Sequence, residues 1–320
     1  MAPLVSILIP CHNAERWLVQ TLESALGQTW PNTEIIVVDD GSADDSLEIA
    51  RSFEPRGVTV LAQENQGACA ARNRALEEAK GAFIQFLDAD DLLTPDKIEL
   101  QMRRLRDEPE GTIAAAPWKR FYETPGDYES TSKSHESWHD FEDPLNWLLQ
   151  SARGETMMPL HGWLVSRSLI EKAGCWNEDL LLNQDGEYFA RVLLEAHQIV
   201  FCPGPTVYYR TTEEGISTRN SRVKWKSFLR SWNLIYNHIA GERDGPEVRC
   251  SLASLYKRTA FRVYPKYPKI SKTAKKRAED LCDVEWEFPD TSFLMRLTIR
   301  TLGWRRARQI QVNYRKFVYG

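Results

Sequence analysis

The sequence contains no apolar run long enough to cross a membrane as a helix. Such a helix needs about 20 consecutive apolar residues, and no stretch of these 320 residues approaches that length. The chain enters the strand pattern Val5–Ile9 without a basic segment, a long apolar segment or a cleavage site before it. We therefore expect a cytoplasmic protein without a secretion signal, whose contact with the inner face of the membrane is at most peripheral.

Cysteine is also scarce and scattered. None of the six cysteines stands in a C-x-x-C pair or at a spacing typical of zinc ligands. The sequence therefore favours reduced, unpaired thiols at all six positions, which are Cys11, Cys69, Cys175, Cys202, Cys250 and Cys282.

Two glycine-rich phosphate-binding signatures are missing as well. No G-x-G-x-x-G follows the first predicted strand, and no G-x-x-x-x-G-K-[ST] occurs anywhere. These absences exclude a dinucleotide-binding fingerprint and a P-loop, so any phosphate in this chain must be recognised by other groups.

The two parts of the chain carry opposite net charges. The segment from Arg219 to the end carries 23 Lys and Arg against 9 Asp and Glu, whereas the rest carries 18 basic and 36 acidic residues. We expect a domain over 1–218 and a basic helical extension over 219–320. The split indicates either an anionic partner for the extension or attraction between the two regions, and composition does not decide between them. Nucleic acid is not expected, because no recognisable reading motif accompanies the basic residues.

The first hundred residues alternate between strand and helix patterns with short connections. Repeated βα units predict a parallel, right-handed, doubly wound α/β sheet with helices on its faces. The predicted strands are Val5–Ile9, Glu34–Val38, Val58–Ala62 and Ala82–Leu87. A helix with apolar positions Leu18, Leu22, Ala25 and Leu26 follows the first strand, and further helices are predicted over Asp45–Phe53, Gln66–Ala79 and Pro95–Arg106.

The middle of the chain is less regular. The segment Trp118–Asp143 is polar and acidic without a clear period, which is typical of an excursion near a binding site. A capping box, Ser168 with Glu171 three residues later, predicts a short helix that Gly174 ends. A further helix is predicted after Asn183, and helices continue beyond Arg219.

Acidic residues follow the fourth predicted strand. Asp88, Asp90 and Asp91 come directly after the apolar run Ala82–Leu87, at the sheet edge where open α/β folds bind ligands. Carboxylate oxygens are the ligands that Mg²⁺ and Mn²⁺ prefer. The sequence therefore predicts a metal site at Asp88 and Asp90. The alternative is that these acids are ordinary loop and cap residues.

The loops after the other three strands carry complementary groups. The loop after the first strand offers an imidazole ring and amide groups to a base. The loop after the second strand offers carboxylates to the N–H groups of a base or to the hydroxyl groups of a ribose. The third loop leads into a helix whose free backbone N–H groups, with an arginine one turn later, suit a phosphate. Together they predict a nucleotide-diphosphate site that comprises Pro10, His12, Asn13, Glu15, Asp40, Gly67, Arg72 and Asp88.

Four motifs in this order resemble a known family. They are Val5–Pro10 with His12-Asn13, Val38-Asp39-Asp40-Gly41-Ser42, Asn65-Gln66-Gly67 with Ala71-Arg72-Asn73, and Phe86–Asp91. The set is similar to the signature series of family 2 inverting glycosyltransferases with the GT-A fold, over about residues 4–215.

The resemblance implies a nucleotide-sugar donor, usually a UDP-sugar, with Mn²⁺ or Mg²⁺. It implies that Pro10, His12 and Glu15 border the nucleoside, that Asp40 accepts from the base and that Arg72 lies near the phosphates. It further places Asp88 at the ribose or sugar and makes Asp90 the metal ligand.

The family's general base is commonly part of a Glu-Asp pair at a helix start. The matching stretch here makes Asp185 the counterpart, with Gln184 in place of the usual glutamate and Glu187 as a reserve candidate. Inversion requires one carboxylate to remove the proton of the acceptor hydroxyl. The family's Tyr-Arg-x-His sequence corresponds to Tyr209–Thr212 without the histidine, which would leave Arg210 to serve the phosphates.

The acceptor side is less defined. His161 resembles an acceptor-side histidine of some relatives, and Trp163 or Trp176 would suit stacking on a sugar, although such residues are more often structural parts of the core. The resemblance implies a hydroxyl acceptor, such as a lipid-linked or polysaccharide precursor. The altered base motif also allows a non-catalytic adaptor that binds nucleotide sugar or membrane. A glycosidase is disfavoured, since hydrolysis needs no nucleotide pocket.

Overall fold

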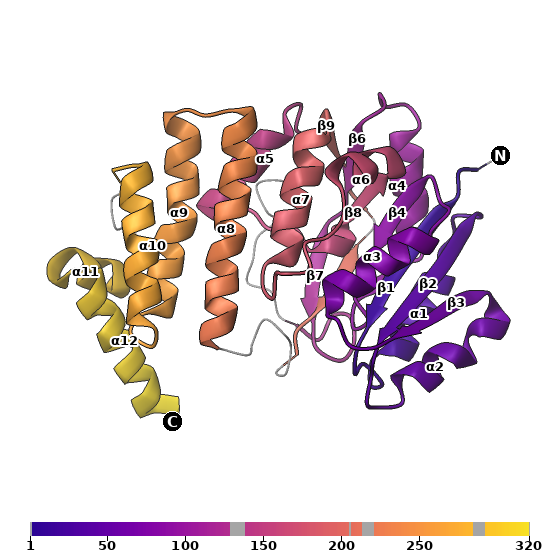
Figure 1. The fold of residues 1–320 in the computed structure, drawn as a ribbon, viewed down its shortest axis with the longest axis horizontal. Helices are drawn as coiled ribbons and strands as arrows, with labels where there is room; N and C mark the ends of the chain where they lie inside the picture. The colour runs from indigo at the N-terminus through magenta and orange to yellow at the C-terminus, as the bar shows by residue number, and fades with distance from the viewer. Residues whose placement is uncertain (1, 129–137, 205, 213–220, 284–291, 320) are drawn as a thin grey trace. The chain divides into compact units, whose positions relative to one another are not determined.

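The computed structural model describes residues 2–128, 138–204, 206–212, 221–283 and 292–319 (Figure 1). The chain divides into two compact units. One comprises Met1–Leu148 with Thr156–Arg219, and the other comprises Leu149–Glu155 with Asn220–Gly320. The domain boundary expected near residue 218 falls within 213–220, outside the described residues.

The first unit is built around a seven-stranded sheet. Its order is β3-β2-β1-β4-β8-β6-β9, in which β1 is parallel to β2 and β4, β2 is parallel to β3, and β6 is parallel to β9. Strand β8 runs antiparallel to β4 and β6. The predicted mainly parallel, doubly wound α/β sheet is thus confirmed. The strands are β1 (Val5–Cys11), β2 (Thr33–Asp40), β3 (Val58–Gln63), β4 (Phe83–Phe86), β6 (Thr112–Ala115), β8 (Trp163–Ser166) and β9 (Gln198–Phe201).

The apolar run of β1 is buried because helices cover it. Val5, Ile7 and Ile9, at alternate positions, join the apolar faces of α1 and α4 in one core cluster, since successive strand side chains point to opposite faces. Helix α3 also packs on β1 and β2 (Figure 1). The helices of this unit are α1 (Leu18–Leu26), α2 (Ser46–Ser52), α3 (Ala68–Glu78), α4 (Lys97–Leu105), α6 (Arg167–Ala173) and α7 (Gln184–Glu195).

Several local predictions were wrong. The helix expected from Pro95 begins at Lys97, with Asp96 at its N-cap, and Leu92–Leu93 before it forms strand β5, which was not predicted. The cap of α6 is Ser166, whose hydroxyl accepts from the N–H of Leu169, and not Ser168. A three-stranded sheet, β5-β10-β7, was not predicted, because strands this short show no clear period. It adds β7 (Trp118–Phe121) and β10 (Val207–Arg210).

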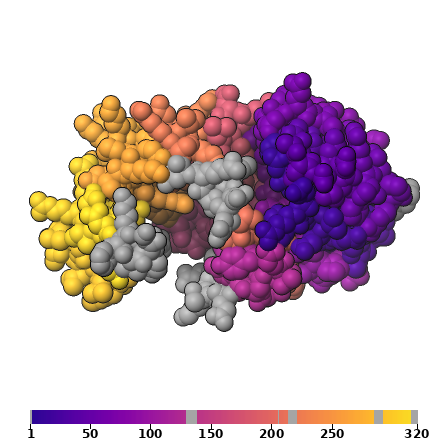
Figure 2. Space-filling model, turned by 90° about the horizontal axis from the view of Figure 1, so that it is seen from below, coloured from indigo at the N-terminus to yellow at the C-terminus, as the bar shows by residue number. Residues whose placement is uncertain are grey.

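The second unit is helical, as predicted. Its helices α8 (Arg222–Glu242), α9 (Pro246–Val263), α10 (Pro268–Leu281), α11 (Phe293–Leu302) and α12 (Trp304–Tyr319) pack around small side chains such as Ala260 and Ala274. Helix α5 (Pro144–Arg153), which was missed in the sequence, ends in this unit. Atoms of the C-terminal helices, coloured yellow, lie at the surface in Figure 2. Within the described ranges, no helix combines the length and apolar character needed to span a bilayer.

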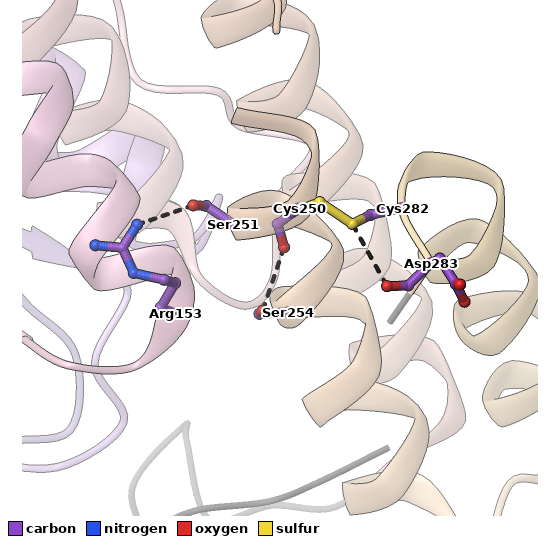
Figure 3. Close-up of a disulfide and its surroundings, with 6 residues drawn as sticks. All are labelled: Arg153, Cys250, Ser251, Ser254, Cys282 and Asp283. Atoms are coloured by element: carbon purple, nitrogen blue, oxygen red, sulfur yellow. Dashed lines mark hydrogen bonds between the residues drawn. A yellow bond between two sulfur atoms is a disulfide. The ribbon is translucent and has the colours of Figure 1, made fainter. Parts of the chain in front are cut away.

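The prediction of six unpaired thiols was wrong. Cys250 in α9 forms a disulfide with Cys282, directly after α10, at a Cα–Cα distance of 5.0 Å (Figure 3). Scattered spacing gave no sign of this pair, because the helical hairpin that brings the two residues together is a tertiary feature. The other four cysteines are free.

Candidate functional site

The four strands β1 to β4 end at the same edge of the sheet. Cys11 is paired with Asp39, Asp40 with Gln63, and Leu8 with Phe86 in parallel register. The loops that follow these strands therefore meet, as predicted, and they carry the side chains on which the nucleotide-site prediction rests.

Asp40 ties the loop after β3 to the end of β2. Its Oδ1 accepts from the Gln63 side chain and the Gln66 backbone N–H at 2.8 Å each, and its Oδ2 accepts from the Gly67 N–H at 2.8 Å. The prediction of a free Gly67 N–H group was therefore wrong, because the carboxylate already binds it. Asp40 is almost fully buried, and its three hydrogen bonds fix the loop after β3 to the end of β2.

His12 is held in a fixed position although it is exposed. Its Nδ1 lies 2.8 Å from the carbonyl oxygen of Asp40, and the amides of Asn13 and Asn65 lie 3.1 Å from its Nε2. Asn13 adopts a left-handed backbone conformation, with φ of 50°, and its side chain accepts from the N–H of Ala43 at 2.8 Å. The loop thus presents a flat ring in a set orientation.

The neighbours of His12 differ in exposure. Glu15 is exposed, and its Oε2 accepts from the N–H of Asp45 at 3.1 Å. Pro10 is buried within β1. Of these two residues, only Glu15 presents its side chain at the surface.

Arg72, in helix α3 after the β3 loop, links this part of the site to the acids after β4. Its Nη2 lies 2.7 Å from Oδ1 of Asp88, its Nη1 donates to Oε1 of Gln184 at 3.3 Å, and its guanidinium lies over the Trp176 ring. Burial lowers the pKa of the Arg72 guanidinium, but the charge of Asp88, its hydrogen bond to Arg72 and the charges of Cys69 and Asp185 together outweigh that effect and leave the pKa raised. The charged guanidinium of Arg72 is therefore held in a fixed position between Asp88 and the start of α7.

Asp185 lies in the first turn of α7, close enough to this pair to sense both charges. Burial raises the pKa of the Asp185 carboxyl, the charge of Arg72 opposes the rise, and the charge of Asp88 adds to it. The residue as a whole is half-buried. Because Arg72 also binds Gln184, the residue before Asp185, the structure brings Arg72, Asp88 and the first turn of α7 together.

Glu187 cannot serve as the reserve base. Its carboxylate is 2% exposed and accepts from Nε of Arg191 at 2.9 Å, one helical turn away. A buried carboxylate bound to an arginine has no access to an acceptor hydroxyl, so this prediction is corrected.

An aromatic cluster fixes α7 against the end of β4. Phe86, two residues before Asp88, contacts the rings of Trp176 and Tyr188, and these two rings stack at a centroid distance of 3.9 Å. Trp163 is 1% exposed and packs on Phe189. The acceptor role predicted for Trp163 is thus wrong, since its ring faces the core, and Trp176 is likewise a core residue.

Asp90 and Asp88 supply the carboxylates that a divalent cation would require. Burial, followed by the negative charge of Asp88, raises the pKa of Asp90 to about 6. Among the side chains that the structure describes, no group of three or more His, Cys, Asp or Glu is arranged around a common metal position. Protein-bound Mg²⁺ often uses one or two carboxylates together with substrate phosphates. Two mutually repelling carboxylates fit a cation that arrives with a diphosphate.

Arg210 has a structural role instead of the predicted phosphate contact. Its side chain donates to the carbonyl oxygens of Asp90 and Tyr122, at 2.6 Å each, and to Oε1 of Gln20 at 2.7 Å. Its guanidinium also lies 4.0 Å from the centroid of the Trp17 ring. The prediction was wrong because these contacts use the donors that a phosphate would need.

His161 is part of a buried polar network next to the loop after β4, which contains Asp91. It is fully buried, with Nδ1 3.1 Å from Oδ2 of Asp91, and burial lowers the pKa of its imidazole to about 3. The acceptor contact predicted for His161 is therefore corrected. Lys97 is equally buried and donates to the side chain of Gln85. Reasoning from sequence missed this network, although a glutamine inside an apolar strand was a sign of it.

A family model described as glycosyl transferase family 2 matches residues 6–174. A putative teichuronic acid biosynthesis glycosyltransferase, TuaG of Bacillus subtilis, is 43% identical over 103 residues, which is 31% of this chain and 41% of that protein. The chain thus matches less than half the length of the first curated relatives.

Two solved structures share the fold. Staphylococcus aureus TarS 1–349, in complex with UDP-GlcNAc, has a TM-score of 0.70 and 20% identity over 98% of this chain and 92% of that one. The mannosyltransferase PcManGT of Pyrobaculum calidifontis, in complex with GDP-Man and Mn²⁺, has a TM-score of 0.55 and 17% identity over 99% and 88%. The likeness confirms the predicted GT-A type of fold. Because the family model covers more than half of the chain, this protein belongs to glycosyl transferase family 2.

Proposed function

We propose that this protein is an inverting glycosyltransferase that moves a sugar from a nucleotide-diphosphate sugar to a hydroxyl acceptor. The observation that carries the proposal is that Arg72 binds both Asp88 and Gln184, the residue before Asp185 in the first turn of α7. Residues 1–218 form the catalytic domain in this proposal, and 219–320 form a basic helical extension.

The donor lies along the edge of the sheet. His12 presents its ring to the base, with Asn13 and Glu15 beside it, and Arg72 neutralises phosphate charge. TarS and PcManGT, which form complexes with UDP-GlcNAc and GDP-Man, support a nucleotide sugar. UDP is the nucleotide we favour, since TarS is the more similar of the two structures in TM-score.

Asp185 is the general base. Its carboxylate removes the proton of the acceptor hydroxyl while the new C–O bond forms on the face of the sugar opposite the diphosphate. Such proton transfer typically contributes about 10²- to 10⁴-fold to the rate. The aromatic cluster of Phe86, Trp176 and Tyr188 keeps α7 in place, so that Asp185 holds its position relative to Asp88.

Asp90 and Asp88 would hold a divalent cation, Mn²⁺ or Mg²⁺. When bound, the ion supplies electrostatic stabilisation of the departing diphosphate. In its absence, Asp88 remains paired with Arg72, and the repulsion between Asp88 and Asp90 disfavours two negative charges in this loop.

The acceptor is a hydroxyl group of a polysaccharide or glycoconjugate precursor. The name of TuaG, a putative teichuronic acid biosynthesis enzyme, supports this class. A lipid-linked precursor would bring the protein to the inner face of the membrane.

Release of UDP from UDP-GlcNAc tests the proposal. In the presence of Mn²⁺ the wild-type protein should release UDP slowly without an acceptor, and Asp90→Ala should abolish that release. Asp96→Ala, which changes an exposed acid before α4, should leave it unchanged. Full UDP release by Asp90→Ala would contradict the role of Asp90. Binding of UDP-sugars without any turnover would favour the alternative, a non-catalytic adaptor.

A further inference from the structure

Helix α11 has two apolar faces, of which the fold uses one. Met295 and Ile299 pack into a core cluster with Ala260 of α9, Ala274 of α10 and Trp304 of α12. Phe293, Leu294 and Leu297 remain 71%, 73% and 50% exposed. A helix that is already anchored by its inner face needs no second apolar face for its own stability.

The exposed residues form one continuous stripe. At about 100° per residue, Phe293, Leu297 and Leu294 fall within an arc of about 100° on the helix. Arg300 and Arg296 follow on one side of this stripe, and Thr298 lies on the other. The arrangement of large apolar side chains bordered by arginines is typical of a helix that lies in a membrane interface.

From α11 onward the charged residues have one sign, although Asp283, Glu285, Glu287 and Asp290 stand before this helix. Residues 291–320 contain seven Arg and Lys and no Asp or Glu. Exposed apolar side chains continue in α12, where Ile310 and Tyr314 are 50% and 63% exposed and lie one turn apart. An anionic phospholipid surface matches this combination, because it attracts the basic residues and accepts the apolar ones.

We propose that the stripe Phe293, Leu294 and Leu297 of α11 docks the protein on an anionic phospholipid surface. The helix lies parallel to the surface, its apolar side chains enter the boundary between head groups and acyl chains, and the arginines beside them contact lipid phosphates. This inference does not rest on the proposed glycosyl transfer.

Flotation of the full-length protein with vesicles tests the inference. We expect binding to vesicles of phosphatidylcholine with phosphatidylglycerol, much weaker binding to phosphatidylcholine alone, and loss of binding at high salt. Leu294→Glu with Leu297→Glu should weaken binding about tenfold or more, since it places two charges at the inserted face. Both positions are exposed, so the fold is retained, which circular dichroism and the melting temperature check.

The matched control is Val223→Glu on α8, where an apolar residue is 63% exposed outside this segment. It should bind vesicles as the wild-type protein does. Absence of wild-type binding, or equal binding by the double variant, would overturn the inference. Two further results would overturn it. One is light scattering that shows a dimer of the wild-type protein and a monomer of the double variant, and the other is binding of single-stranded RNA, instead of vesicles, to the same stripe.

Discussion

The guanidinium of Arg72 and the carboxylate of Asp88 form an ion pair at 2.7 Å between Nη2 and Oδ1. The pair joins α3, which follows the loop after β3, to the acidic loop after β4. Because Arg72 also binds Gln184 at the start of α7, one side chain sets the relative positions of three parts of the candidate site.

Replacement of Arg72 by methionine should therefore weaken both folding and donor binding. Removal of one partner of a buried ion pair costs about 3–5 kcal/mol, and the partial exposure of Asp88 places the expected loss near the lower end. Denaturant unfolding and UDP calorimetry measure the two effects. Arg51→Met, at an exposed position of α2, serves as the control. Wild-type stability and UDP affinity in Arg72→Met would contradict this role.

The pH dependence of transfer should report on Asp185. A general base acts when deprotonated, and the pKa of Asp185 is raised by burial, so activity should fall as the pH drops through a value above the ordinary aspartate pKa of about 3.9. The acid limb of kcat/KM against pH measures that value. A limb at or below the ordinary pKa would argue against this carboxyl as the base.

The buried Lys97 should make stability depend on pH. Burial lowers the pKa of its ammonium group well below the ordinary value, so the unfolded chain binds a proton that the folded chain lacks. The free energy of unfolding should then rise with pH between the lowered pKa and the ordinary value of about 10.4, by at most about 1.4 kcal/mol per pH unit.

Denaturant unfolding at pH 7, 8 and 9 tests this slope. Lys97→Met should remove this contribution, because methionine does not titrate, whereas Lys80→Met, at an exposed position, should keep it. An unchanged slope in Lys97→Met would show that Lys97 is charged in the folded protein.

The disulfide between Cys250 and Cys282 should stabilise the helical unit. It closes a loop with a sequence separation of 32, for which cross-linking typically contributes about 2–4 kcal/mol. Cys250→Ser should lower the free energy of unfolding by that amount, and Cys175→Ser, at an exposed free cysteine, should not. Equal stability of the two variants under oxidising conditions would mean that the bond does not form in solution.

The sequence contained enough information for the first four βα units and for their shared edge. Their apolar periods are long, and the residues that end each strand are polar, so the positions of Asp40 at the end of β2 and of Asp88 and Asp90 after β4 could be predicted. The contacts of Arg72 with Gln184, of His161 with Asp91 and of Arg210 with Asp90 join segments that are distant in the chain. No local pattern encodes such contacts, which explains why buried polar residues were taken for ligand contacts.

The central claim is that Asp185 deprotonates the acceptor opposite a donor held beside Arg72 and Asp88. The most direct test compares Asp185→Asn with Glu195→Gln, an exposed acid at the end of the same helix. Single-turnover transfer and UDP calorimetry are measured on both. We expect Asp185→Asn to bind UDP as the wild-type protein does but to transfer the sugar about 10²-fold or more slowly, whereas Glu195→Gln should do both normally. Wild-type transfer by Asp185→Asn would contradict the claim.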